Sequence, residues 1–138
     1  MFEDCLYFNT TSLARTVEKA WADAFRKFGL TPAQAFCLRV VNAYPSVRPS
    51  ELAAMLGMSR ATATRLLDHL EAKRWIRRKA TTADNRELAV VPTAKARSHA
   101  SEIESASAEM TKKMKAALGG TEFLSVVKRL RLVRKSLG

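Results

Sequence analysis

The segment 50–71 constrains the fold of this chain more than any other. Two helices that cross at a steep angle need a small residue where they touch and a tight turn between them. Ala53 supplies the small residue, and Gly57 follows four residues later, where a left-handed backbone suits glycine. The apolar residues expected beneath are Leu52, Leu56, Met58, Leu66, Leu67 and Leu70. The pattern predicts a helix-turn-helix; the plainer alternative is a helical hairpin with a glycine turn.

The face opposite these leucines has the chemistry of a DNA-reading helix. Small hydroxyls near a helix start donate to phosphates or bases, and an arginine can pair with two acceptors on a guanine edge. Asp68 and Glu71 lie further along and are expected to repel phosphate, so contact is predicted in the first two turns. The predicted DNA-binding residues here are Ser59, Arg60, Thr62, Thr64 and Arg65.

Two β-rich runs follow, at 75–79 and 87–91, with polar turn residues between them. They predict a two-stranded hairpin with a basic tip, which can act as a wing in a neighbouring minor groove. Asp84 and Arg86 are two residues apart and can pair, so Asp84 is expected to brace the loop. Arg86 and Lys79 are the predicted DNA contacts of the wing. The alternative is a solvated hairpin without a specific role.

Helical periodicity accounts for most of the remaining chain. We expect six helices, over about 4–28, 32–44, 49–57, 59–73, 93–118 and 121–137, and hence a mainly α fold with one hairpin. Thr31, Pro32 and Gln34 form a helix-start signal, and Thr93 and Thr121 are expected to cap the last two helices. The second helix is expected to bury Phe36, Cys37, Val40, Val41 and Tyr44.

The charge balance favours a polyanionic partner. The chain has 24 Lys and Arg residues against 13 Asp and Glu, a net charge of +11. Such a balance suits nucleic acid or an anionic membrane surface, although charge can also serve solubility alone. No run of about 20 apolar residues exists for a bilayer span, and the acidic start at Glu3 and Asp4 is unlike a secretory signal. A cytoplasmic protein that is not inserted in a membrane is expected.

Catalytic and metal signatures are missing from the sequence. His69 and His99 are isolated, and Cys5 and Cys37 make neither a disulfide framework nor a zinc set. The five glycines form no phosphate loop, and no nucleophile stands beside a base. We therefore expect no enzyme activity, no cofactor and no metal.

The order of these motifs resembles the MarR family of winged helix-turn-helix transcription regulators. The resemblance is carried by the segment 50–71, SELAAMLGMSRATATRLLDHLE, and by Asp84, Asn85 and Arg86 followed by the run 91–93. It implies one domain over 1–138, with a DNA-binding lobe at 46–92 and dimerisation helices at 1–30 and 93–138. The chain departs from the family pattern at Arg48, at Arg74, and at Ala96 or Arg97, one of which replaces a glycine usual after the wing.

Two apolar seams indicate a homodimer, as the resemblance also implies. A period of 3.5 joins Ala96, Ala100, Ile103, Ser107, Met110, Met114 and Ala117. A second seam contains Phe123, Val127, Leu130, Val133 and Leu137. A two-fold dimer presents two recognition helices to DNA. The alternative is that both seams pack within one protomer.

The resemblance further implies a small aromatic effector held between the dimer helices and the DNA-binding lobe. The candidate lining residues are Trp21, Phe25, Phe36, Tyr44 and Trp75, although aromatic residues at helical spacing are more often core. Some relatives sense peroxide through a cysteine near the chain start, which makes Cys5 the candidate redox residue; an inert cysteine is the alternative.

We therefore expect a sequence-specific repressor that binds a palindromic operator as a dimer on double-stranded DNA and is released by the effector. The alternatives are a peroxide sensor acting through Cys5 and a nonspecific architectural DNA-binding protein. Steep salt dependence with weak sequence preference would favour the architectural protein, and a defined footprint would favour the regulator.

Overall fold

The computed structural model describes residues 1–80 and 88–138. In the part described, the fold is mainly α with one two-stranded sheet, as predicted. Asp84 and Arg86, the expected brace and tip of the wing, lie outside the described residues. The elements are α1 (Leu6–Phe25), the 3-10 turn η1 (Arg26–Phe28), α2 (Pro32–Ala43), α3 (Pro49–Leu56), α4 (Arg60–Ala72), β1 (Ile76–Lys79), β2 (Ala89–Pro92), α5 (Ala94–Leu118) and α6 (Gly120–Leu137).

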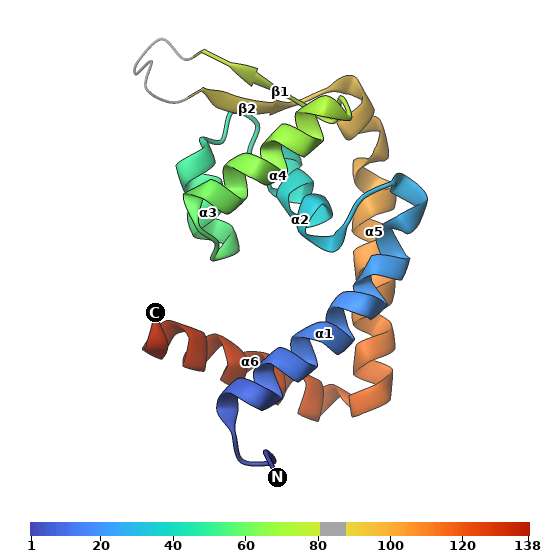
Figure 1. Ribbon diagram of the computed structural model, residues 1–138. Coiled ribbons are helices and arrows are strands. Elements are labelled where there is room, and N and C mark those ends of the chain that lie inside the picture. The colour runs from blue at the N-terminus through green and yellow to red at the C-terminus, as the bar shows by residue number, and fades with distance from the viewer. Residues whose placement is uncertain (81–87) are drawn as a thin grey trace.

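These elements separate into a lobe and a helical base. Figure 1 shows α2, α3, α4 and the two strands gathered at one end of the molecule. The long helix α5 runs away from this lobe, α1 crosses it, and α6 lies at the far end (Figure 1). α5 packs against α1, α2 and α6, so it joins the lobe to the base.

Most helix ends follow the signals in the sequence. The Thr31 side chain accepts from the Gln34 amide at 3.2 Å, and the Gln34 side chain accepts from the Thr31 amide at 3.1 Å, which is the predicted reciprocal cap. Thr93 caps α5 as predicted: its side chain accepts from the Ala96 amide at 3.3 Å. The prediction for Thr121 is wrong: Gly119 is the capping residue and α6 begins at Gly120. Gly119 has a φ of 85°, which suits glycine, so the helix starts before the threonine.

The sheet is antiparallel and pairs Ile76 with Pro92 and Lys79 with Ala89. The second strand therefore lies nearer the C-terminus than the predicted run 87–91. Val47, just before α3, forms a bridge with Val90, whose amide donates to the Val47 carbonyl at 2.8 Å. The start of the helix-turn-helix is thus tied directly to the hairpin.

The core lies under the lobe and extends along α5. Its fully buried large side chains include Phe25, Leu38, Leu52, Leu67, Leu70, Ile76 and Ile103. Tyr44 does not join them: it is 56% exposed, so the prediction that it faces inward is wrong. α2 ends at Ala43 and Tyr44 leaves the helical conformation with a ψ of 74°, which takes its side chain off the buried face.

The first seam predicted for dimerisation is largely used inside the protomer. Ala96, Ile103, Ser107 and Met110 are buried within the chain, and α5 packs against α1 and α2. For this stretch the alternative of packing within one protomer is the one observed. The second seam remains on the surface, with Val127, Leu130 and Leu137 exposed on α6. No helix among the described residues is long and apolar enough to cross a membrane.

Candidate nucleic-acid interface

The turn between α3 and α4 has the geometry that the sequence predicts. Gly57 has a φ of 64° and a ψ of 36°, and its amide donates to the carbonyls of Ala53 and Ala54. Ala53 and Leu52 are buried beneath the turn. A residue with a Cβ would be strained at this φ, so the glycine sets the angle at which α4 leaves α3.

α4 begins at a cap that also positions two hydroxyls. The Ser59 Oγ accepts from the Thr62 amide at 3.1 Å and donates to the Thr62 Oγ1 at 2.9 Å. Thr62 is half-buried, whereas Ser59 is exposed. Ser59 and Thr62, two of the predicted DNA-binding residues, lie at the start of the helix, where backbone amides also favour a phosphate. Both hydroxyls already take part in the cap.

The remaining predicted contacts share the outer face of α4 and the end of β1. Arg60, Thr64, Arg65 and Lys79 are all exposed. Ala63, Leu67 and Leu70 are buried on the opposite face. Within residues 1–80 and 88–138 no ion pair involves Arg65. The structure thus places four of the predicted side chains on the surface of the lobe.

Arg78 is an element of this surface that sequence reasoning missed. Its guanidinium donates to Asp68 at 2.8 Å and to Glu71 at 2.9 Å, so the two carboxylates expected to repel phosphate are paired. The pattern contained a usable signal: alternation along β1 puts Arg78 on the same side as the buried Ile76. Arg77 and Lys79 then point away from α4.

A second charged pair orders the start of α3. The Glu51 side chain accepts from the Arg48 amide at 3.0 Å and from the Arg48 guanidinium at 2.9 Å. The hydrogen bond from the guanidinium, and to a smaller extent the one from the amide, holds the pKa of Glu51 below its ordinary value. Arg48 stands where a threonine or serine cap is common in the resembled family, and the carboxylate supplies the reciprocal contact instead.

The five aromatic residues expected to line an effector pocket do not meet in one cavity. Trp21, Phe25 and Phe36 form a ring cluster, with centroids 5.5 to 6.3 Å apart, and Phe25 is fully buried. Trp75 lies elsewhere, 5.4 Å from the His99 ring, and Tyr44 is exposed. Trp21 and Phe36 line a hollow of about 270 Å³ between α1 and α2.

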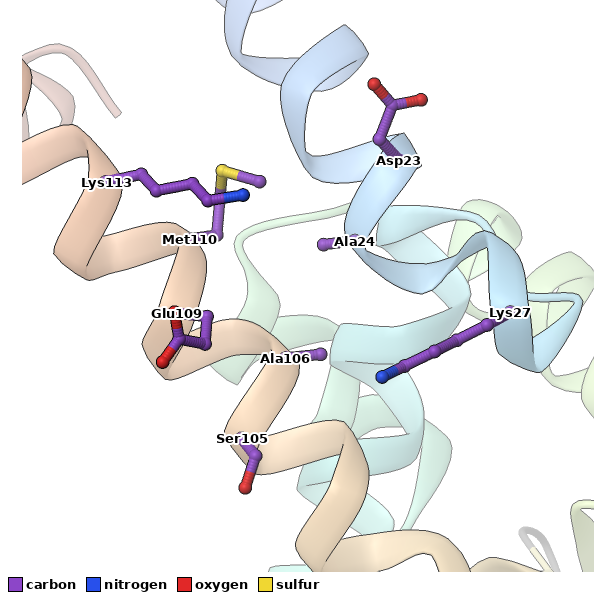
Figure 2. Close-up of a pocket in the computed structure, with 8 residues that line it drawn as sticks. All are labelled: Asp23, Ala24, Lys27, Ser105, Ala106, Glu109, Met110 and Lys113. Atoms are coloured by element: carbon purple, nitrogen blue, oxygen red, sulfur yellow. The ribbon is translucent and has the colours of Figure 1, made fainter.

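A larger cleft of about 370 Å³ lies between α1 and α5 (Figure 2). Ala24, Ala106 and Met110 form its apolar part, and Lys27 and Lys113 extend into the space from opposite helices. None of the five predicted aromatic residues lines it. The cleft lies beside the seam of α5 rather than in the lobe.

The two cysteines have opposite environments. Cys5 is exposed at the start of α1, whereas Cys37 is fully buried in α2. Burial raises the pKa of the Cys37 thiol from 9.0 to about 12, so this thiol stays protonated at neutral pH. In the described part of the chain, no three His, Cys, Asp or Glu side chains gather in a way that could hold a metal ion.

Comparison with known protein families identifies a likeness over the lobe. Residues 28–87 match the model of the MarR family, and this range covers α2, α3, α4 and β1. Among curated proteins, the transcriptional repressor MprA of Escherichia coli (strain K12) is 49% identical over 41 residues. That segment is 30% of this chain and 23% of MprA.

Comparison with solved structures extends the likeness to nearly the whole chain. The S. aureus MepR–DNA complex matches with a TM-score of 0.85 and 19% identity over 97% of this chain and 99% of that one. The transcriptional repressor CouR, bound to a 23-mer DNA duplex, matches with a TM-score of 0.86 and 22% identity over 96% and 94%. This chain therefore has the winged-helix fold of these structures, helical base included.

Proposed function

We propose that this chain, whose residues 28–87 match the MarR family, is a transcription regulator that binds double-stranded DNA through the outer face of α4. The observation that supports this most strongly is the exposed set of Arg60, Thr64 and Arg65 on the second helix of a turn fixed by Gly57. A helix presented in this way fits the major groove, where arginine can read a guanine edge. MepR and CouR, which share the fold, were solved bound to DNA.

The charge of the lobe favours the same partner. Residues 46–92 contain 9 basic and 5 acidic residues, and two of those acidic residues are paired with Arg78. Lys79, exposed at the end of β1, stands where the hairpin leaves the lobe. We assign to Lys79 and Arg86 the contacts of the wing with a neighbouring groove.

A homodimer is part of this proposal. Two terminal stretches expose apolar side chains within the helical base, which α1 and α6 form with α5 (Figure 1). The exposed residues are Leu6, Tyr7, Phe8 and Leu13 at the start of α1, and Leu124, Val127, Leu130, Val133 and Leu137 on α6. A surface of this kind on a small chain is costly in water. A second copy is the occupant we propose, because two lobes related by two-fold symmetry would meet a palindromic site.

Repression and release by a small molecule complete the proposal. A regulator that occupies an operator blocks transcription, and MprA, which matches the DNA-binding segment, is a repressor. A ligand could sit between α1 and α5 or between α1 and α2. It would shift the base relative to the lobe, because α5 packs against α1 and α6 of the base and against α2 of the lobe. Such a ligand releases the protein from DNA only if it binds the released conformation more tightly than the DNA-binding conformation.

The experiment is a footprint on the DNA upstream of the chain's own gene, at one fixed salt concentration. We expect a protected palindrome, and we expect its protection to be lost when the right small aromatic compound is added. Peroxide is a separate arm: release by peroxide that disappears in Cys5→Ser would identify a redox sensor instead. Equal binding to all duplexes, with a steep salt dependence, would identify an architectural protein.

A further inference from the structure

The contacts of Arg78 indicate a further residue that supports the proposed DNA binding. We propose that Arg78 is a positioning residue for DNA binding: it fixes the wing strand β1 on the recognition helix α4 and holds both α4 carboxylates in place. The inference rests on the proposed function, since it concerns the same DNA-binding surface. It assigns Arg78 no contact with DNA.

The geometry joins one arginine to two carboxylates on successive turns. The Nη2 of Arg78 donates to the Asp68 Oδ1 at 2.8 Å, and its Nη1 donates to the Glu71 Oε1 at 2.9 Å. The Arg78 amide also donates to the Glu71 Oε2 at 3.2 Å. Glu71 therefore holds the side chain and the main chain of β1 at once. A planar guanidinium suits this arrangement, whereas a lysine ammonium is a point charge that cannot reproduce the fork.

Burial separates this arginine from its neighbours on the strand. The Arg78 side chain is 18% exposed, although its partners Asp68 and Glu71 are 64% and 44% exposed. Ile76, two residues earlier, is buried on the same side of β1, and Arg77 and Lys79 lie exposed on the other side. Arg78 is thus turned toward α4, where its Nη2 also lies 3.5 Å from the Thr64 carbonyl oxygen.

The position of the hairpin depends on this contact. β1 pairs with β2, and β2 is tied to the start of α3 through Val47 and Val90. β1 is also held by Ile76, which is buried in the core, and by Arg78, which attaches it to α4. Lys79 follows directly, so the direction in which the strand leaves α4 decides where its cation lies relative to the recognition helix.

Removal of the two carboxylates separates a charge effect from a positioning effect. Asp68→Asn with Glu71→Gln makes α4 more positive, so a simple charge account expects tighter binding to every duplex. The positioning account expects weaker binding to the specific site, because Arg78 loses its ionic partners and β1 loses its fixed direction. Both substituted side chains are exposed and close to isosteric with the originals, so the fold should tolerate them.

The test compares Arg78→Met, Arg78→Lys and the Asp68→Asn, Glu71→Gln double variant with the unaltered protein. Arg77→Met is the matched control, since it removes the same charge from the exposed neighbour. Binding is titrated on the footprinted site and on random duplex at one salt concentration. We expect the three variants to lose about tenfold or more of their preference for the specific site, and Arg77→Met to weaken both duplexes alike.

Amide hydrogen exchange on the protein without DNA supplies an independent readout. We expect the amides paired between β1 and β2 to exchange at least about tenfold faster in Arg78→Met than in Arg77→Met. Equal exchange in the two variants, or tighter specific binding by the double variant, would overturn the inference. Failure of the unaltered protein to prefer any duplex would instead contradict the proposed function, and the exchange rates would still decide the role of Arg78.

Discussion

Arg39 on α2 and Glu104 on α5 form a two-bonded ion pair across 65 positions of sequence. The Arg39 Nε donates to the Glu104 Oε1 at 2.7 Å, and Nη2 donates to Oε2 at 3.0 Å. The guanidinium also lies 4.7 Å from the Phe36 ring centroid. This pair joins α2 of the lobe to the long helix α5 of the base.

The pair should contribute a measurable coupling to stability. In a double-mutant cycle with Arg39→Ala and Glu104→Ala, we expect a coupling of about 0.5–1 kcal/mol in the free energy of unfolding, modest because Glu104 is partly solvated. Urea denaturation measures it. Glu102→Ala, at an exposed position of the same helix, is the control and should show no coupling with Arg39→Ala. Zero coupling in both cycles would mean that the pair is energetically idle.

Dimerisation should depend on α6 rather than on the buried seam of α5. Val127→Asp with Leu130→Asp puts two charges on an exposed apolar stripe, so we expect folded monomers in sedimentation and loss of operator binding. Ser136→Asp, at an exposed polar position of α6, is the control and should stay dimeric. A monomeric unaltered protein at micromolar concentration would rule out the dimer.

Ile103 shows why the seam could not be assigned from sequence alone. It is fully buried within the protomer, yet a 3.5-residue period is equally consistent with packing on a second copy or on the chain's own α1 and α2. The period identifies a buried face and leaves its partner open. Substitution of Ile103 by Asp would therefore test folding and not assembly.

Signals that depend on nearby residues predicted the structure better than signals that depend on distant ones, because a sequence pattern does not say which distant element a face packs against. The Thr31 cap, the Gly57 turn and the Ser59 cap depend on residues within four positions, and all three are present. The pairing of Arg78 with Asp68 and Glu71 depends on how a strand lies on a helix. Tyr44 failed as a core residue because the helix ends one residue earlier. The aromatic candidates were separated by the packing of distant elements.

The two cysteines should respond differently to alkaline pH. Cys37 has its pKa raised from 9.0 to about 12 by burial, so the folded state favours the protonated thiol. Its stabilising effect is complete below pH 9 and is lost as the pH rises from 9 towards 12. We expect the unfolding free energy of the unaltered protein to fall more steeply over that range than that of Cys37→Ala, as measured by urea denaturation at successive pH values.

A thiol assay provides the companion measurement. At pH 8 the folded protein should react with about one equivalent of a disulfide reagent, at the exposed Cys5, because the thiolate fraction of Cys37 is negligible. Cys5→Ser should abolish the rapid reaction. Rapid reaction at both positions, or identical pH slopes for the unaltered protein and Cys37→Ala, would contradict the buried, protonated state of Cys37.

The prediction for Arg86 in the wing rests on the sequence, because Arg86 lies outside the described residues. Arg86→Ala should weaken binding to most duplexes and lower the salt slope by about one for each lost phosphate contact. A titration at several salt concentrations measures this slope. Arg77→Ala removes an equal charge from the exposed side of β1, so the wing contact is measured by the fall in slope of Arg86→Ala beyond that of Arg77→Ala. Unchanged affinity and slope in Arg86→Ala would remove the wing tip from the account of binding.

Arg65 tests the central claim most directly, since it lies exposed on α4 opposite the buried Leu67 and Leu70. Arg65→Ala and the unaltered protein are titrated at one salt concentration on the operator, on operators altered at each half-site position, and on random duplex. We expect a loss of about 1–3 kcal/mol on the operator, relaxed preference at one position of each half-site, and a much smaller loss on random DNA. Equal weakening on every duplex would contradict base reading by Arg65 and reduce it to a phosphate contact.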